Sequence, residues 1–350
     1  MKIKILYLYA ELMSYNIAVI KELVTKCNAE VHIISWDKEK LTPYVPPQIE
    51  GVTYYKKSDF NINSAQDFIF KLQPDLVFTS GWMDPFYIKL CKQIRRKNIP
   101  VIAFSDTQWK GTIKQKIGRI YFRLFYKKAF SNILVSGAYQ FEYAKKLGFN
   151  NNQIQLYFLT ADLAVFNHFY NNTIKQKELK YPKNILFAGR FAPEKGLDIL
   201  INAWKGIANK NGWKLTLVGN GILKNELVKH SDIEVLDFVQ PENFESIIEN
   251  SGCFVLPSRN EPWALVLHEF TAAGLPIICS DVCGAAPTFV ISGYNGYTFE
   301  SENIDDLKTK LEKIINKTEK ELIEMAKRSH KIGQRIDPES IAYKFVSFLK

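Results

Sequence analysis

Short apolar runs alternate along the chain with segments whose apolar residues recur at helical spacing. In the first half, the runs that predict strands lie at residues 3–9, 31–36, 76–79, 101–105 and 133–136. The helix-spaced segments between them lie at residues 15–26, 84–97, 113–129 and 139–147. Strands that alternate with helices are typical of βαβ units, so the pattern predicts a parallel, doubly wound sheet.

The alternation restarts after a polar stretch without clear periodicity, residues 170–182, which we interpret as a linker. Further predicted strands lie at residues 184–188, 214–218, 234–238, 253–256 and 276–279. Further predicted helices lie at residues 196–208, 220–229, 242–249 and 264–273. We therefore predict two α/β domains, residues 1–169 and 183–336, and an amphipathic helix at 337–350 that can pack on either domain, including back on the first.

Two glutamates, Glu261 and Glu269, lie eight residues apart, after one predicted strand and in the helix that follows it. Open α/β sheets bind ligands beyond the carboxyl ends of their strands, beside helix N-termini. Two carboxylates near free backbone amides suit a ligand with both hydroxyls and phosphates, such as a nucleotide sugar. The spacing alone fits a helix N-terminal acid and an unrelated surface acid equally well.

Two cations follow the first strand of the second domain, since Gly189 ends that strand and Arg190 and Lys195 lie in the next loop. Arginine forks onto phosphate oxygens and lysine supplies a point charge, so the pair suits a diphosphate. Two solvated surface cations are the alternative. A Gly-Asn-Gly turn at 219–221 ends another strand, but it lacks the third glycine of the dinucleotide-binding fingerprint.

The positive charge of the chain is concentrated in its first half. Residues 1–165 hold 23 Lys and Arg against 13 Asp and Glu, whereas residues 166–350 hold 23 of each. Residues 110–128 alone contain seven cations, four aromatic residues and no acid, with apolar residues at helical spacing. Such a helix can lie on an anionic membrane surface. Alternatively, its apolar face packs on the sheet and its basic face is solvated.

The five cysteines are odd in number and form no CxxC pair, so we expect buried free thiols in a reducing compartment. The N-terminal segment is basic and then apolar, but a first core strand explains it better than a signal peptide. No apolar run is long enough to span a bilayer. We expect a cytoplasmic protein, peripheral on the cytoplasmic face of the membrane.

The motifs of the second half, taken in order, resemble the C-terminal domain of glycosyltransferase family 4. The resemblance rests on residues 189–196, on the Val218–Gly221 turn, and on the two glutamates within residues 257–269; it continues through 273–276 and Asn295-Gly296. It implies the GT-B fold, in which two Rossmann-like parallel-sheet domains face each other across a cleft. Residues 1–165 resemble the family only in their βαβ layout.

The resemblance also implies the role of each matching residue. Gly189, Arg190 and Lys195 would hold the donor diphosphate, Glu261 would face the anomeric carbon of the donor sugar, and Glu269 would bind the ribose hydroxyls. Backbone amides at the start of the helix would cradle sugar and phosphate, namely those of Trp263, Ala264 and Leu265. The backbone of Val239 would contact the nucleobase. Ala264 stands where the family commonly has glycine, and we expect an ordinary helical φ there.

The first domain departs from the family pattern. A histidine is common near the end of the fourth strand, whereas this chain has Asp106 there, which could orient the acceptor or the donor sugar or simply cap its loop. The DxD metal motif of the other large transferase fold is absent. We therefore expect no metal and no cofactor, with the cations neutralising the diphosphate.

The resemblance implies a retaining, metal-independent glycosyltransferase (a hexosyl- or related transferase) that moves a sugar from a nucleoside-diphosphate sugar to a hydroxyl of a glycan or lipid-linked acceptor. Surface polysaccharide, lipopolysaccharide or glycolipid synthesis would be its setting. A GT-B sugar-nucleotide epimerase or hydrolase is the alternative, because its donor site would look similar. A nucleic-acid-binding module is a minor alternative that the net charge of +10 suggests, although no nucleic-acid-binding motif supports it. We expect no nucleic-acid partner.

Overall fold

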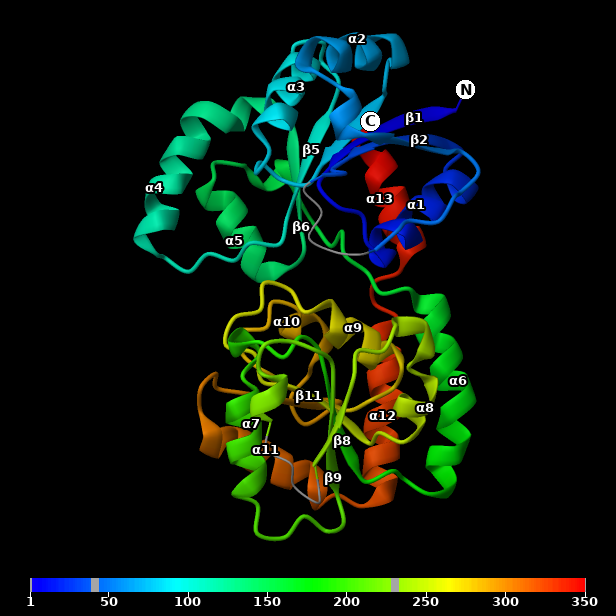
Figure 1. Cartoon of the computed structure of the whole chain (residues 1–350), viewed down its shortest axis with the longest axis vertical. Coiled ribbons are helices and arrows are strands. Elements are labelled where there is room, and N and C mark those ends of the chain that lie inside the picture. The colour runs from blue at the N-terminus through cyan, green and yellow to red at the C-terminus, as the bar shows by residue number, and fades with distance from the viewer. Residues whose placement is uncertain (1, 39–43, 228–232, 350) are drawn as a thin grey trace. The chain divides into compact units, whose positions relative to one another are not determined.

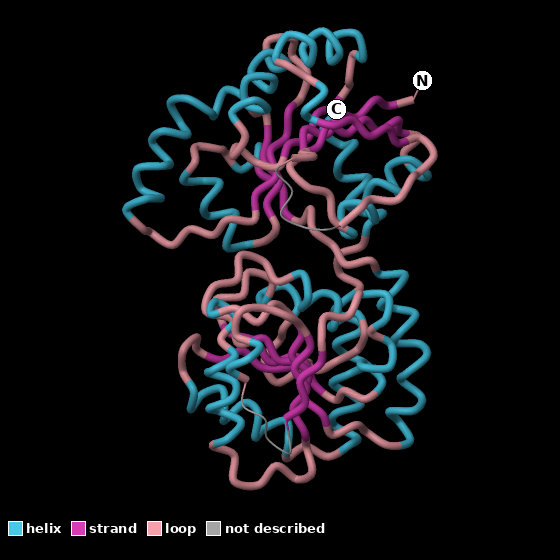
Figure 2. Tube along the Cα trace, in the orientation of Figure 1, coloured by secondary structure: helices cyan, strands magenta, loops and turns pink. Residues whose placement is uncertain are grey.

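The computed structural model describes residues 2–38, 44–227 and 233–349. The chain forms two compact units, of which unit 1 comprises Met1–Thr160 with Ile336–Lys350, and unit 2 comprises Ala161–Arg335. Each unit contains one parallel sheet with helices on both faces (Figures 1 and 2). Two parallel sheets interleaved with helices are what the sequence predicts.

Unit 1 contains a seven-stranded sheet in the order β3-β2-β1-β4-β5-β6-β7. Its strands are β1 (Ile3–Tyr9), β2 (Ala29–Ser35), β3 (Val52–Lys56), β4 (Leu76–Thr79), β5 (Val101–Ser105), β6 (Asn132–Val135) and β7 (Ile154–Leu156). Its α-helices are α1 (Ser14–Lys26), α2 (Ile62–Leu72), α3 (Pro85–Arg95), α4 (Ile113–Tyr121), α5 (Ala138–Lys146) and α13 (Pro338–Val346). The pattern missed β3, β7 and α2.

Unit 2 contains a six-stranded sheet in the order β10-β9-β8-β11-β12-β13. Its strands are β8 (Asn184–Ala188), β9 (Lys214–Val218), β10 (Ile233–Leu236), β11 (Cys253–Leu256), β12 (Ile277–Ser280) and β13 (Gly296–Phe299). Its helices are α6 (Leu163–Leu179), α7 (Leu197–Lys205), α8 (Glu245–Glu249), α9 (Leu265–Ala272), α10 (Ala286–Phe289), α11 (Ile304–Ile315) and α12 (Glu319–Gly333). The inner strands β11 and β12 are buried along their whole length, and β8 is buried after its first residue, because helices cover both faces of the sheet.

The predicted linker at 170–182 is wrong in its structure, because most of it lies in α6. The inward stripe of this helix is Phe166, Phe169, Thr173 and Lys177, of which two are polar. A hydrophobic pattern cannot reveal such a stripe. The first segment of unit 1 ends at Thr160 rather than at residue 169.

The predicted helix at 220–229 is also wrong for the residues that the structure describes. Only a short 3-10 turn, Lys224–Glu226, forms there, and residues 228 and 229 lie outside the described residues. The final helix α13 belongs to unit 1, where it packs against α1. Its Phe345 ring lies 4.5 Å from Phe78 and 5.3 Å from Phe104, measured between ring centroids.

The segment predicted as one helix at 113–129 consists of α4, a π-helical turn, Phe122–Tyr126, and a 3-10 turn, Lys127–Ala129. Its apolar stripe does not pack on the sheet, since Ile113, Ile117 and Leu124 are 75%, 64% and 68% exposed. The alternative of an inward apolar face is therefore wrong.

Among the described residues, no helix is both long and apolar enough to cross a membrane. The five cysteines are free thiols, and four of them are buried.

Candidate functional site

A cavity of about 480 Å³ lies in unit 2 at the carboxyl ends of its strands. The strand order reverses between β8 and β11, which are neighbours in the sheet although β9 and β10 separate them in sequence. Loops after these strands, together with α6 and α9, line the cavity. Open α/β sheets bind their ligands at such a reversal point, so the fold itself marks this cavity.

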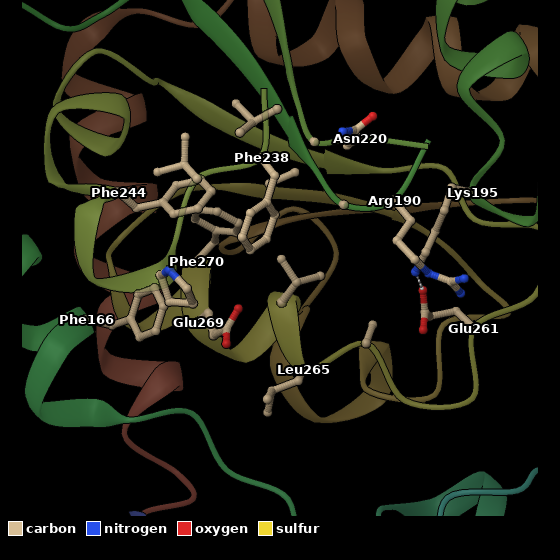
Figure 3. A pocket seen from close by; sticks show the side chains of 18 residues that line it. Phe166, Arg190, Lys195, Asn220, Phe238, Phe244, Glu261, Leu265, Glu269 and Phe270 are labelled. Carbon is tan, nitrogen blue, oxygen red and sulfur yellow. Dashed lines mark hydrogen bonds and ion pairs between the residues drawn. The ribbon is translucent and has the colours of Figure 1, made fainter. Parts of the chain in front are cut away.

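One end of the cavity is ionic. Lys195 and Glu261 form an ion pair there (Figure 3), with side chains 16% and 11% exposed. The Ser258 hydroxyl donates to the same Glu261 oxygen at 3.2 Å. Gly196 permits this contact, because its left-handed backbone passes so close to Pro257 that a Cβ would lie 2.1 Å from the carbonyl oxygen. The structure therefore brings together two residues that the sequence places 66 positions apart.

Arg190 follows β8 and donates to Glu194 at 3.0 Å, with 76% of its side chain exposed. Figure 3 shows its side chain beside Lys195, at the same end of the cavity. A surface ion pair contributes only about 0–1 kcal/mol, so the guanidinium can leave Glu194 for a stronger anion at small cost. Arg190 and Lys195 together can hold a diphosphate at this end.

The other end of the cavity is aromatic. Glu269 lies there, close to Phe166, Phe244 and Phe270, as Figure 3 shows. Burial, assisted by the nearby carboxylate of Glu242, raises the pKa of Glu269 to about 7. A carboxylate acceptor of this kind, surrounded by aromatic side chains, suits a hydroxyl-bearing ligand with a flat ring that can stack on those side chains.

Helix α9 begins between the two ends. Ala264 precedes its first residue with φ +76° and ψ +69°, so the expected helical φ is wrong and the residue is left-handed. This conformation directs the chain from the Glu261 loop into the helix. Ala264 and Leu265 line the cavity, whereas Trp263 is buried, with its carbonyl accepting from Ala285 N–H at 2.7 Å. The first N–H groups of a helix have no acceptor within it, so they can bind an anion.

The remaining predicted residues of unit 2 also line the cavity. Gly189 lies beside Gly219, and a Cβ on Gly219 would lie 1.9 Å from the Gly189 carbonyl oxygen. The weak Gly-Asn-Gly signal therefore marks a close backbone approach that shapes the wall of the cavity. Val239 also lines the cavity, in the loop after β10.

Asp106 lies in unit 1, exposed in the loop after β5. It is close to Tyr15, whose pKa burial raises to about 12, with Asp106 and Glu11 adding to the shift. These groups gather at the carboxyl ends of β1 and β5. Asp106 is therefore not among the residues around the unit 2 cavity, and its role stays a hypothesis.

Sequence reasoning missed the aromatic enclosure of Glu269. Phe238 and Phe244 flank the predicted Val239, so proximity to a strand end could have suggested them. Phe166 could not have been found, because the prediction assigned residues 1–169 to the first domain.

Among the described residues, no group of three or more His, Cys, Asp and Glu side chains could hold a metal ion.

Comparison with known families decides the identity of this unit. Residues 170–334 match the profile of the family described as "Glycosyl transferases group 1". Most of unit 2 is therefore similar to the group 1 glycosyltransferases. The match begins within α6 and ends before α13, so it coincides with most of unit 2 and includes every cavity residue named above except Phe166.

Several curated relatives are also named as glycosyltransferases. A glycosyltransferase of Methanocaldococcus jannaschii is 38% identical over 140 residues, which are 38% of this chain and 38% of that protein. The O-antigen biosynthesis glycosyltransferase WclY of Escherichia coli is 24% identical over 294 residues, covering 75% of this chain and 74% of its own. The match spans only 36–40% of the length of three of these curated relatives.

Solved structures share the fold of both units. HepE of Anabaena, crystallised in complex with UDP-glucose, superimposes with a TM-score of 0.69 at 14% identity. The superposition covers 99% of each chain. At this identity the likeness establishes the GT-B fold of the chain and no more.

Proposed function

We propose that the chain is a retaining glycosyltransferase that takes its sugar from a nucleoside-diphosphate sugar. One observation carries the proposal: a single cavity holds two cations and a carboxylate at one end and a carboxylate among aromatic rings at the other. A nucleotide sugar has the same order of groups, since the diphosphate and sugar follow the ribose and base. The UDP-glucose complex of HepE, which has the same fold, supports this assignment.

Each residue has a part in the proposed reaction. Arg190 and Lys195 hold the diphosphate, and the first amides of α9 add hydrogen bonds to it. Glu269 accepts from the ribose hydroxyls, and Val239 lies against the base together with the surrounding aromatic rings. Glu261 exchanges Lys195 for the hydroxyls of the donor sugar and faces its anomeric carbon.

The bond from the anomeric carbon to the diphosphate oxygen breaks while a bond to the acceptor oxygen forms on the same face of the sugar. The departing phosphate oxygen takes the proton of the acceptor hydroxyl. The cations stabilise the charge that develops on the leaving group, so we propose that the reaction needs neither a metal nor a cofactor. Asp106 remains a candidate for orienting the acceptor.

The acceptor we propose is a hydroxyl of a glycan or a lipid-linked sugar in surface polysaccharide or glycolipid synthesis. The E. coli relative named for O-antigen biosynthesis supports this setting. Lipid-linked acceptors lie in a membrane, so we propose a cytoplasmic enzyme that is peripheral on that surface. A nucleic-acid partner is not part of the proposal.

The test uses Glu261→Gln, which keeps the shape of the side chain but removes its charge. We expect nucleotide affinity to stay within about threefold of wild type while transfer falls by at least about 100-fold, because the lost contacts belong to the reacting sugar. The matched control is Glu302→Gln, an exposed acid that does not line the cavity. Retained transfer in Glu261→Gln would refute this role. Nucleotide release that needs no acceptor would favour the hydrolase or epimerase alternative.

A further inference from the structure

The segment from residue 110 to residue 128, here called the α4 surface, exposes large apolar side chains on a surface helix. The exposed side chains are those of Ile113, Ile117, Ile120, Tyr121, Leu124 and Phe125, each at least half exposed. Figure 1 draws α4 at the periphery of unit 1, outside α5. A soluble protein rarely leaves so many large apolar groups together in water without an interaction partner.

The helix is attached to unit 1 by its opposite side. The Gln115 amide donates to the Gln108 carbonyl at 2.7 Å, and Phe122 is 2% exposed. The guanidinium of Arg119 lies over the Trp109 ring at 5.8 Å. At 100° per residue these three side chains lie on one side of the helix and the isoleucines on the other. The apolar stripe therefore points outward because the inner side is already fixed.

Cations border the exposed stripe. Lys116 and Arg123 lie along one edge and Lys114 along the other, and all three are exposed. Between residues 107 and 141 the chain contains no Asp or Glu. The surface is therefore both apolar and strongly positive.

The apolar and positive groups together distinguish between the kinds of partner that could cover the α4 surface. A second copy would bring the same positive surface, and no acid of this segment could neutralise it. A nucleic acid would neutralise the cations but leave Ile117 and Leu124 in water. A bilayer with anionic headgroups satisfies both, since its interface accepts apolar side chains while its phosphates attract lysine and arginine.

We propose that the α4 surface docks on an anionic lipid bilayer, with the helix lying in the plane of the interface and its apolar stripe among the acyl chains. The docking surface belongs wholly to unit 1. It deepens the membrane attachment proposed above and does not depend on the donor site, so a failure of vesicle binding would leave the proposal of nucleotide binding standing.

The test measures co-flotation of the full chain with vesicles of phosphatidylcholine alone and with added phosphatidylglycerol. One variant carries Ile117→Ser and Leu124→Ser, and another carries Lys114, Lys116, Arg123 and Lys128 as Gln. Matched controls in unit 1 are Val45→Ser with Met83→Ser, and Lys21, Lys26, Lys71 and Lys89 as Gln, which are also exposed. Because all substituted side chains are exposed, the variants should fold, and their thermal melts check this.

We expect wild type and both controls to float with anionic vesicles and only weakly with neutral ones. Partitioning should fall roughly 100- to 1,000-fold in the charge variant and at least about 10-fold in the apolar variant. Equal flotation of wild type and the apolar variant would overturn the proposal, as would an equal loss in the two charge variants. Concentration-dependent self-association of wild type that the apolar substitutions abolish, without flotation, would assign the surface to a second copy instead.

Discussion

Glu269 occupies surroundings that disfavour its charged form, because aromatic rings surround it and Glu242 is nearby. Its pKa is about 7 in the folded chain, against 4.5 as the ordinary value. Between these two values the folded chain keeps a proton that the unfolded chain loses. The free energy of unfolding therefore falls as the pH rises from 4.5 to 7, and the cost is complete above pH 7.

Glu269→Gln removes this cost, since a neutral amide has no charge to bury. Without ligand, the free energy of unfolding of the variant should exceed that of wild type by on the order of 2 kcal/mol at pH 8 and by little at pH 4.5. It should also bind nucleotide about 10-fold or more weakly, because a charged acceptor is lost. Thermal melts at both pH values measure the first effect. Glu324→Gln, a substitution of an exposed acid, should change neither the free energy of unfolding nor the nucleotide affinity. A gain in stability of Glu269→Gln that does not depend on pH would contradict the account.

Ala264 is left-handed, a conformation that costs a residue with a Cβ about 1 kcal/mol or more. Ala264→Gly should therefore raise the free energy of unfolding by about 0.5–1 kcal/mol, even after the greater entropy of the unfolded chain is counted. The matched control is Ala326→Gly in the interior of α12, which should lower it by about 1 kcal/mol. Denaturant unfolding measures both, and a loss of stability in Ala264→Gly would contradict the assigned backbone.

At the level of residues, the sequence predicts part of the site. Lys195, Glu261 and Glu269 follow strand ends and helix starts, and the structure places all three around one cavity. The contribution of Phe166 to the aromatic end and the left-handed backbone of Ala264 could not be predicted, because the folded arrangement of the elements determines both. The direction of the Arg190 side chain, which pairs with Glu194, is likewise a property of the folded loop.

At the level of elements, α6 shows how a helix can escape a hydrophobic pattern. Lys177 occupies an inward position and is 2% exposed, and its ammonium nitrogen donates to the Ser251 carbonyl at 2.9 Å. Burial lowers its pKa to about 7, although Glu249 partly opposes the shift. Within unit 2, α6 is thus held by a polar contact, and burying the charge of Lys177 for this contact costs free energy of desolvation.

Lys177→Met should reveal this cost as a pH dependence. The wild-type free energy of unfolding rises with pH between about 7 and 10, because the unfolded chain keeps the proton that the folded chain has released. The Met variant lacks this rise, so its stability relative to wild type should be greater at pH 6 than at pH 9 by about 2–3 kcal/mol. Denaturant unfolding at both pH values checks this. Lys175→Met, exposed on the same helix, should show no such difference.

A buried histidine of helix α9 that does not line the cavity holds the helix in place through two hydrogen bonds. His268 Nδ1 accepts from Ala161 N–H at 3.0 Å, and Nε2 donates to the Gly333 carbonyl at 2.8 Å. Burial lowers the pKa of His268 to about 4, so the ring stays neutral. The residue beside Glu269, the candidate for binding the ribose, is therefore a structural support.

At the level of the whole molecule, alternation of strands and helices was enough to predict two parallel sheets. It could not predict that the chain returns to unit 1 after Arg335, because that depends on the packing of α13 against α1. The excess positive charge lies in residues 1–165. Within unit 1 the α4 surface presents part of this charge together with exposed apolar groups.

The central claim is that the unit 2 cavity binds a nucleoside diphosphate through its ionic end. Calorimetric titration of the full chain with a panel of nucleoside diphosphates tests it most directly. We expect at least one to bind with one site per chain and to stabilise the fold by about 2.7 kcal/mol at 100 times its dissociation constant. Arg190→Gln and Lys195→Gln should each weaken binding at least about 10-fold, and the control Lys308→Gln should not. Binding by no nucleotide, or equal binding by wild type and both variants, would contradict the account.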